Sequence, residues 1–269
     1  MKSNVKNILN NRYEIRGIIN SGAFSVVYHA YDQWLKGDVA IKELSPLTRI
    51  SSQEALVKRF KREARITRRL RHPYIIEIYD LFWAQDTLYI VMPYLPDSLD
   101  KRLKHTPCLN LSESVHIVTQ ICEGLAYAHT AFRDKQGVYP IIHCDIKPGN
   151  ILFDEFEQVK IADFGIAHIP PLPGIVDQVP LTAFNAGTIA YMPPEQLDGE
   201  RTDPRIDVYA IGALLYRMIT GDYYLDFEEV TTEHALQNNQ RRIRYEAPSR
   251  VPLEAAQVPK PLSDIIIKA

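Results

Sequence analysis

The stretch His143-Cys144-Asp145-Ile146-Lys147-Pro148-Gly149-Asn150 is the most informative part of this 269-residue chain. Apolar runs lie on both sides of it, Ile141-Ile142 before and Ile151-Leu152-Phe153 after. Such runs predict short buried strands that hold a polar loop between them. Pro148 and Gly149 disfavour a regular helix, so the acid, ammonium and amide groups of the loop can converge. Taken alone, the octapeptide also fits an ordinary turn in which Asp and Asn stabilise the backbone.

Two later motifs decide between these interpretations. Val159-Lys160-Ile161-Ala162 alternates like a strand and leads into Asp163-Phe164-Gly165, and Met192-Pro193-Pro194-Glu195 follows. Together with Asp145-x-Lys147-x-x-Asn150, and in this order, they resemble the catalytic loop, the metal-binding loop and the closing motif of protein kinases. The resemblance covers nearly the whole chain. It implies a bilobal α+β fold, with a small antiparallel sheet and one helix in an N-terminal ATP-binding lobe (residues 12–92) and a larger, mainly helical lobe for catalysis and substrate binding (residues 93–269).

The resemblance also implies an activity, the Mg²⁺-dependent transfer of the γ-phosphoryl group of ATP to serine or threonine hydroxyls of protein substrates. Asp145 would orient or deprotonate the hydroxyl, Lys147 would stabilise the transferred group, and Asn150 and Asp163 would bind the metal. A lysine two residues after the catalytic aspartate is typical of the serine/threonine branch. In the same branch, Thr188 would face the substrate.

The predicted phosphate-binding residues lie in the first ninety residues. Val39-Ala40-Ile41-Lys42 matches the kinase strand whose lysine contacts the ATP phosphates, although a solvent-facing lysine is the commoner fate on a strand. A helix predicted from about Gln53 to Leu70 carries Glu63 on its apolar face. A buried carboxylate needs a partner, and Lys42 is the natural one. The hairpin turn expected to cover the phosphates keeps Gly22, with Asn20 and Ser25 at the other two glycine positions.

The adenine site is implied by the resemblance alone. Met92 falls at the gatekeeper position, the Pro93 carbonyl would accept a hydrogen bond from adenine, and the Leu95 N–H would donate one. The apolar residues that would enclose the ring are Val27, Ala40 and Leu152.

Several further elements can be predicted from pattern. Strands are expected at residues 75–82 and 88–92. Asn110-x-x-Glu113 indicates a capping box, and the helix after it, to about His129, is expected to bury one apolar face. That face comprises Val115, Val118, Ile121, Cys122 and Leu125. A helix that opens at Asp207 and ends at Thr220 is apolar almost all round and must be buried. In kinases this aspartate caps the backbone of the catalytic loop, and the simpler alternative is a helix N-cap.

Two features depart from the kinase pattern. Cys144 replaces the arginine that in many kinases binds a phosphorylated residue of the activation segment, so control by phosphorylation of that segment is not expected. The predicted C-terminal helix from Leu262 stops before the arginine that in kinases pairs with the position of Glu195, so the chain is expected to be a fragment or a short domain.

Composition limits the remaining possibilities. A net charge of −2 argues against a nucleic-acid partner, and the strongly basic segment Lys58–Arg71 is either a solvated face or a docking patch for an acidic or phosphorylated partner. Three unpatterned cysteines indicate a reducing compartment, and the sequence shows neither a signal peptide nor a membrane-spanning run, so a cytoplasmic location is expected.

Two alternative functions remain, a nucleotide-binding pseudokinase scaffold and a small-molecule phosphotransferase. The intact Asp145, Asn150 and Asp163 argue against the scaffold.

Overall fold

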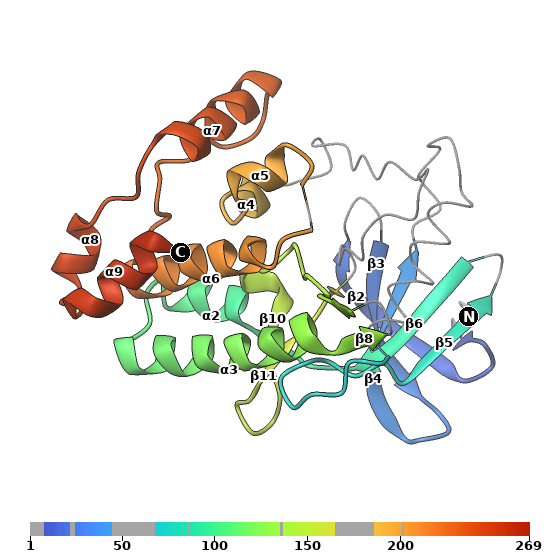
Figure 1. The fold of residues 1–269 in the computed structure, drawn as a ribbon. Coiled ribbons are helices and arrows are strands. Elements are labelled where there is room, and N and C mark those ends of the chain that lie inside the picture. Colours follow the sequence, from blue (N-terminus) through green and yellow to red (C-terminus); the bar gives the residue numbers. More distant parts are fainter. Residues whose placement is uncertain are drawn as a thin grey trace. The chain divides into compact units, whose positions relative to one another are not determined.

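The computed structural model describes residues 8–21, 25–44, 68–84, 87–134, 137–164, 186–200 and 202–269. The chain divides into two compact units. The first comprises Met1–Arg71 and Ile76–Pro96, and the second His72–Ile75 and Asp97–Ala269. Figure 1 shows the fold, with labels on the helices and on most of the strands.

The first unit is built on a six-stranded antiparallel sheet in the order β1-β2-β3-β4-β6-β5. Its strands are β1 (Ile8–Leu9), β2 (Tyr13–Ser21), β3 (Ser25–Asp32), β4 (Gly37–Leu44), β5 (Asp80–Ala84) and β6 (Thr87–Pro93). One face of this sheet carries a buried apolar core, to which neighbouring strands contribute alternate residues. The core residues are Tyr13, Ala30, Val39, Ile41, Tyr89 and Val91. Because side chains alternate along a strand, the residues between these core positions point to the opposite face.

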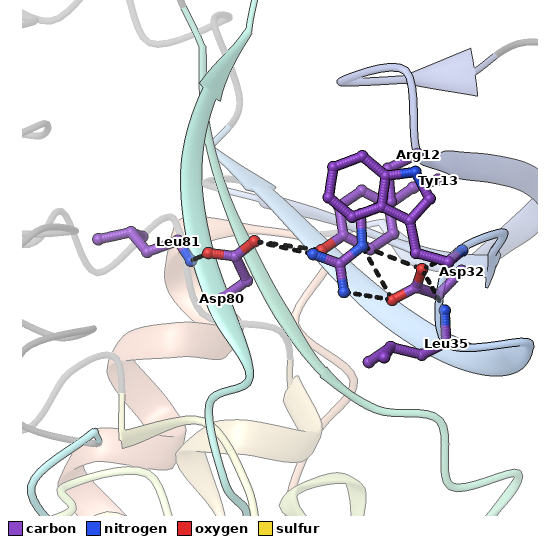
Figure 2. Close-up of polar contacts among 7 residues, drawn as sticks. Arg12, Tyr13, Asp32, Leu35, Asp80 and Leu81 are labelled. Carbon is purple, nitrogen blue, oxygen red and sulfur yellow. Dashed lines mark hydrogen bonds and ion pairs between the residues drawn. The ribbon is translucent and has the colours of Figure 1, made fainter.

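A buried ion pair closes the β3–β4 hairpin of this unit (Figure 2). The Arg12 guanidinium donates to both carboxylate oxygens of Asp32, at 2.9 Å to Oδ1 and 2.6 Å to Oδ2. Asp32 Oδ1 also accepts from the backbone N–H groups of Trp34 and Leu35, at 2.9 and 3.2 Å. These hydrogen bonds, that from Arg12 above all, hold the pKa of Asp32 below its usual value. The same guanidinium approaches Asp80 at 3.6 Å, so it links the hairpin to β5.

We expect Asp32→Asn to lower the free energy of unfolding by about 2 kcal/mol near neutral pH, because a charged donor loses its charged acceptor. A lowered pKa in the folded state means that the stabilisation is complete above a pH of about 4, where an unfolded aspartate ionises, and is lost as the pH falls below it. Urea unfolding should therefore show a difference in the free energy of unfolding between the wild type and the variant, and this difference should narrow as the pH falls.

The matched control is Asp38→Asn. Asp38 pairs with Arg16 at 2.7 Å, but both side chains are 43% exposed. Its loss should cost no more than about 1 kcal/mol. Equal losses from the two variants, or a gap for Asp32→Asn that does not depend on pH, would contradict the role given to the buried pair.

The second unit is mainly helical. Its helices are α2 (Leu99–His105), α3 (Leu111–Thr130), α4 (Ala186–Ile189), α5 (Pro194–Leu197), α6 (Arg205–Thr220), α7 (Glu233–Tyr245), α8 (Val251–Ala255) and α9 (Lys260–Lys268), with one 3₁₀ turn, η1 (Pro148–Asn150). Its strands are β7 (Asp97–Ser98), β8 (Phe132–Asp134), β9 (Gly137–Tyr139), β10 (Ile151–Phe153) and β11 (Val159–Ile161). The predicted order, an N-terminal antiparallel sheet followed by a mainly helical part, is confirmed.

Helix α6 is the buried axis of the second unit, as its apolar sequence predicts. It packs against α3 and α9. At Gly212 a Cβ atom would lie 2.6 Å from the side chain of Ala269, so only glycine allows α9 to approach this closely. Helix α6 ends at Gly221, whose φ of 81° is the left-handed conformation that glycine favours at a helix C-terminus.

Three predictions of local structure need correction. The strand expected from Ile75 begins only at Asp80, and Ile75 itself forms an isolated bridge with Ile161. The capping box is only half formed, because the Asn110 side chain accepts from the Glu113 N–H at 2.9 Å while the Glu113 carboxylate bonds the Asn110 side chain. A 3₁₀ turn occupies Pro148–Asn150, where no helical turn was expected.

The buried face of α3 is also shifted from the predicted one. Of the five residues expected on it, Val115 is 38% exposed and Cys122 is exposed. Helix α3 instead buries Ser114, Ile117, Gln120, Ile121, Gly124, Leu125 and Ala128. The helix expected from Gln53 lies almost wholly outside the described residues. Within the described parts of the chain, no helix is both long and apolar enough to cross a membrane.

Candidate active site

The catalytic loop lies between a buried apolar pair and β10. The run after the loop forms the predicted strand, but the prediction is wrong for Ile141-Ile142, which belongs to no strand although it is buried. Ile141, Ile142 and Ile151 are each no more than 1% exposed, so they anchor both ends of the loop in the core. His143 is fully buried and fixes the backbone within the loop. Its Nδ1 accepts from the Asp145 N–H at 3.2 Å and its Nε2 donates to the Ala162 carbonyl at 2.9 Å, which requires the neutral tautomer protonated on Nε2. Ala162 immediately precedes Asp163, so this one ring joins the two motifs.

The polar groups of the loop converge on Asp145. Its Oδ2 lies 2.8 Å from Lys147 Nζ and accepts from Asn150 Nδ2 at 2.9 Å. Lys147 Nζ also donates to Thr188 Oγ1 at 3.2 Å. Among the described residues, Asp145 Oδ1 has no hydrogen-bond partner. One oxygen of this carboxylate is therefore held by one ammonium and one amide, while the other is available to a hydroxyl.

Asn150 and Asp163 have the chemistry of Mg²⁺ ligands. Asn150 Nδ2 donates to the Asp145 carbonyl at 2.8 Å as well as to its carboxylate. Two acceptors fix the nitrogen on that side, so the amide oxygen points away, and no described residue donates to it. Asp163 has a φ of 68°, an uncommon left-handed conformation for a residue other than glycine. Mg²⁺ prefers oxygen ligands and keeps few of them from protein, so this pair fits the metal.

Asp207, in the first turn of α6, holds the loop from behind. It is fully buried and accepts from the backbone N–H of His143 at 2.8 Å and of Cys144 at 2.9 Å. A third bond, at 2.8 Å, joins it to Nε2 of His129 on α3. The predicted cap of the loop backbone is therefore confirmed. The helix N-cap residue is Pro204, so the alternative of an ordinary N-cap is wrong.

Cys144 is buried in the loop rather than presented to a partner. It is 3% exposed and packs in a cluster with Ile142 and Ile206, at a φ of 60°. Its carbonyl accepts a hydrogen bond of 2.7 Å from the side chain of Gln196, on α5. The loop is thus fixed from two directions, by α6 through Asp207 and by α5 through Gln196.

In the first unit, the strand register gathers four predicted ATP-site residues on one face of the sheet. Lys42 is paired with Val27 of β3, and Ala40 is paired with Met92 of β6. Paired residues of antiparallel strands point to the same face, and Ala40 and Lys42 are two positions apart, so all four side chains share a face. Lys42 is only 7% exposed. Pro93 pairs with Val39 and therefore points to the other face, which leaves its carbonyl as the group of interest.

A comparison with known protein families decides what this constellation is. The family model described as "Protein kinase domain" matches residues 13–268. The chain belongs to the protein kinase domain family. Its relatives include the serine/threonine-protein kinase PrkC of Bacillus subtilis, 33% identical over 97% of this chain and 37% of that protein. Another is the serine/threonine-protein kinase PknB of Mycobacterium tuberculosis, 34% identical over 80% of this chain and 33% of that protein.

The kinase domain thus spans about a third of the length of the curated relatives it matches, between 30% and 37% for the first three. By family and relatives it is a protein kinase domain of the serine/threonine type. This family uses ATP with a divalent metal, which agrees with the acid, amide and lysine positions described above.

Not every predicted site residue of the kinase domain can be placed. Gly22 and Glu63 lie outside the described residues, as does most of the basic segment Lys58–Arg71. Leu95 is described and partly buried in the first unit, whereas Leu152 lies on β10 of the second unit. The Lys42–Glu63 pair and the adenine contacts of Met92, Pro93 and Leu95 stay predictions.

Sequence reasoning missed three residues that hold the site of the kinase domain together. These are His143, His129 and Gln196. A histidine directly before the catalytic motif was visible in the sequence, but its partner carbonyl is 19 residues away along the chain. Gln196 follows Glu195 and bonds a carbonyl 52 residues away, a contact that no local pattern indicates.

Proposed function

We propose that this domain transfers the γ-phosphoryl group of ATP to serine or threonine hydroxyls of proteins, in the cytoplasm. The observation that carries the proposal is the environment of Asp145. One of its carboxylate oxygens is bound by Lys147 and Asn150, and the other has no partner among the described residues. That arrangement orients a carboxylate toward an incoming hydroxyl, as phosphoryl transfer requires.

Each residue of the loop then has a distinct role. Asp145 Oδ1 accepts the hydrogen bond of the substrate hydroxyl and, as the bond to phosphorus forms, its proton. Lys147 bridges the Asp145 carboxylate and Thr188 Oγ1, so its ammonium lies between the acid and the substrate-facing segment, where negative charge develops. Thr188 fixes that segment against the loop, and Lys42, with Glu63, positions the phosphates.

Asn150 and Asp163 would hold Mg²⁺, which would neutralise charge on the ATP phosphates. The free amide oxygen of Asn150 and the unusual backbone conformation of Asp163 support this assignment. Gly22, Val27, Ala40, Met92, Pro93, Leu95 and Leu152 complete the proposed nucleotide site. The basic segment Lys58–Arg71 remains a proposed docking site for an acidic or phosphorylated partner.

The test is transfer of labelled phosphate from ATP and Mg²⁺ to the domain itself and to acidic and basic carrier proteins. We expect Mg²⁺-dependent labelling that phosphoamino-acid analysis assigns to serine and threonine. Binding of ATP without any transfer would favour the pseudokinase scaffold. Transfer to a small molecule and to none of the proteins would favour the small-molecule phosphotransferase.

A further prediction concerns Cys144. A buried thiol offers neither the positive charge nor the fork of donors with which arginine binds a phosphate. We therefore expect phosphatase-treated domain, untreated domain and a Thr182→Ala variant to transfer phosphate to an added substrate at rates within about twofold of one another, because a phosphate there gains little ordering energy from this loop.

Thr182 belongs to a part of the chain that the structure does not describe, so the measurement has to be kinetic. Circular dichroism of each form would confirm that it is folded. A large drop in rate after phosphatase treatment and in Thr182→Ala would show that a cation other than residue 144 binds the phosphate.

A further inference from the structure

Arg217, near the end of α6, carries an unpaired donor beside the proposed active site. Its Nη1 is buried, and it is the one such side-chain nitrogen or oxygen among the described residues that has no hydrogen-bond partner. A guanidinium keeps its charge at any physiological pH, so it cannot relieve the cost of burial by losing a proton. The ring of Tyr223, 5.3 Å from the guanidinium carbon, compensates part of this cost.

A chain of contacts connects Arg217 with the catalytic loop. Tyr223 lies edge-on to Tyr191, with 6.3 Å between the ring centroids. The Tyr191 N–H donates to the Thr188 carbonyl at 3.2 Å, and Thr188 Oγ1 accepts from Lys147. Burial raises the pKa of Tyr191 well above its usual value, and the nearby positive charge of Arg217 lowers it in part. Arg217 is therefore linked to the segment that carries Thr188 through two tyrosine rings.

The carboxylate that influences Tyr191 already has a partner of its own. Asp100, on α2, is close enough to influence Tyr191, but its carboxylate is bonded to Lys104 at 2.7 Å. No ion pair within 4.0 Å joins Arg217 to a described acid. Tyr223, the ring next to the guanidinium, is 41% exposed, so the ring that covers Arg217 borders on solvent.

We propose that Arg217 is a specificity-determining residue of this kinase domain, and that its guanidinium binds an aspartate or glutamate side chain of the substrate protein near the serine or threonine to be phosphorylated. The proposal rests on the proposed function and adds a substrate preference to it. The carboxylate supplies the missing acceptor for Nη1 and neutralises a half-buried charge. Arginine suits this role because its fork of donors matches a carboxylate.

The alternative is a structural role at the helix end. A cation in the last turn interacts favourably with the partial negative charge there, and Arg217 would then only stabilise α6. The two roles differ in one observable, because a purely structural arginine does not affect which peptide is bound.

The experiment uses serine peptides in which a single glutamate is moved one position at a time along both sides of the acceptor, with matched glutamine and lysine peptides. Dissociation constants come from fluorescence anisotropy and kcat/KM from labelled ATP. At one position we expect the wild type to bind the glutamate peptide about tenfold more tightly than the glutamine peptide, and to lose part of this ratio as salt is added.

Arg217→Met should reduce that ratio to about one, and Arg217→Glu should make the lysine peptide the preferred one. The control is Arg242→Met, which removes another partly buried arginine of the same unit that is already paired with Glu246, and it should keep the wild-type ratio. Urea unfolding would show that each variant is folded.

Wild type and Arg217→Met with equal ratios at every position would overturn the inference. Because binding is measured separately from transfer, a wild type that prefers glutamate peptides but labels none of them would refute the proposed function and leave the role of Arg217 supported.

Discussion

Asp145→Asn should reduce phosphoryl transfer by a factor between about a hundred and ten thousand, the range over which a positioned acid–base group contributes to a rate. The carboxylate is held by Lys147 Nζ at 2.8 Å and Asn150 Nδ2 at 2.9 Å, both donors. An asparagine has one oxygen to satisfy them, so its NH₂ group replaces the acceptor that would receive the substrate hydroxyl. The loss should appear in kcat, because the proposed ATP-binding residues are unchanged.

The measurement is steady-state transfer to an added protein, with the ATP dissociation constant determined separately. Asp198→Asn is the matched control, since Asp198 is a surface aspartate of the same unit, bonded to Arg244 and 60% exposed. It should retain wild-type turnover. An Asp145→Asn variant with a tenth or more of wild-type kcat would contradict the assignment of Asp145, and a weakened ATP affinity of the same size would point to a structural effect instead.

The convergence of the three polar side chains of the loop was predictable because their spacing is local. Asp145, Lys147 and Asn150 lie within six residues, and the structure brings their side chains together through bonds that any such loop can make. The sheet of the first unit was predictable for a similar reason, because alternating apolar residues and short turns specify antiparallel hairpins. Those signals extend over only a few residues, and what they predict is equally local.

The wrong predictions have the opposite cause, because they concern contacts between residues that are far apart in the sequence. Val115 and Cys122 were placed in the core because they are apolar, yet α3 turns a polar residue inward instead. Gln120 is 4% exposed, and its Oε1 accepts from the Val159 N–H at 2.9 Å, 39 residues away. That bond satisfies a backbone group that would otherwise be buried without a partner, and it sets the rotation of the helix. Residue type alone cannot indicate such a partner, nor could it indicate that Arg217 Nη1 lacks one among the described residues.

Asp207→Asn should lower the stability of the second unit by at least about 3 kcal/mol, although the side chain keeps its size and shape. Asp207 is fully buried and meets three donors, the N–H groups of His143 and Cys144 and the ring of His129. An amide has one acceptor oxygen for these donors, and its own NH₂ would face at least one of them. Two donor groups that face each other in the core, where water cannot replace the lost hydrogen bond, cost more stability than a small cavity would.

The same substitution should impair catalysis in the fraction that stays folded. Cys144 is held at a φ of 60°, a conformation that costs a residue other than glycine about 1–2 kcal/mol. The bond from its N–H to Asp207 Oδ1 is one of the contacts that maintain this conformation directly before Asp145. Without it the backbone can relax, and a small displacement of Asp145 lowers the rate steeply.

Urea unfolding gives the loss of stability, and hydrogen exchange at the amides of His143 and Cys144 locates it. Asp203→Asn is the control, because Asp203 lies just before the same helix and pairs with Arg205 at 2.6 Å, but the arginine side chain is 83% exposed. That variant should lose no more than about 1 kcal/mol. Equal losses from the two variants, or unchanged protection of the two amides in Asp207→Asn, would show that the loop keeps its shape without the buried carboxylate. Faster exchange confined to those amides, together with a lower kcat, would show that α6 positions the catalytic aspartate through the backbone of the loop.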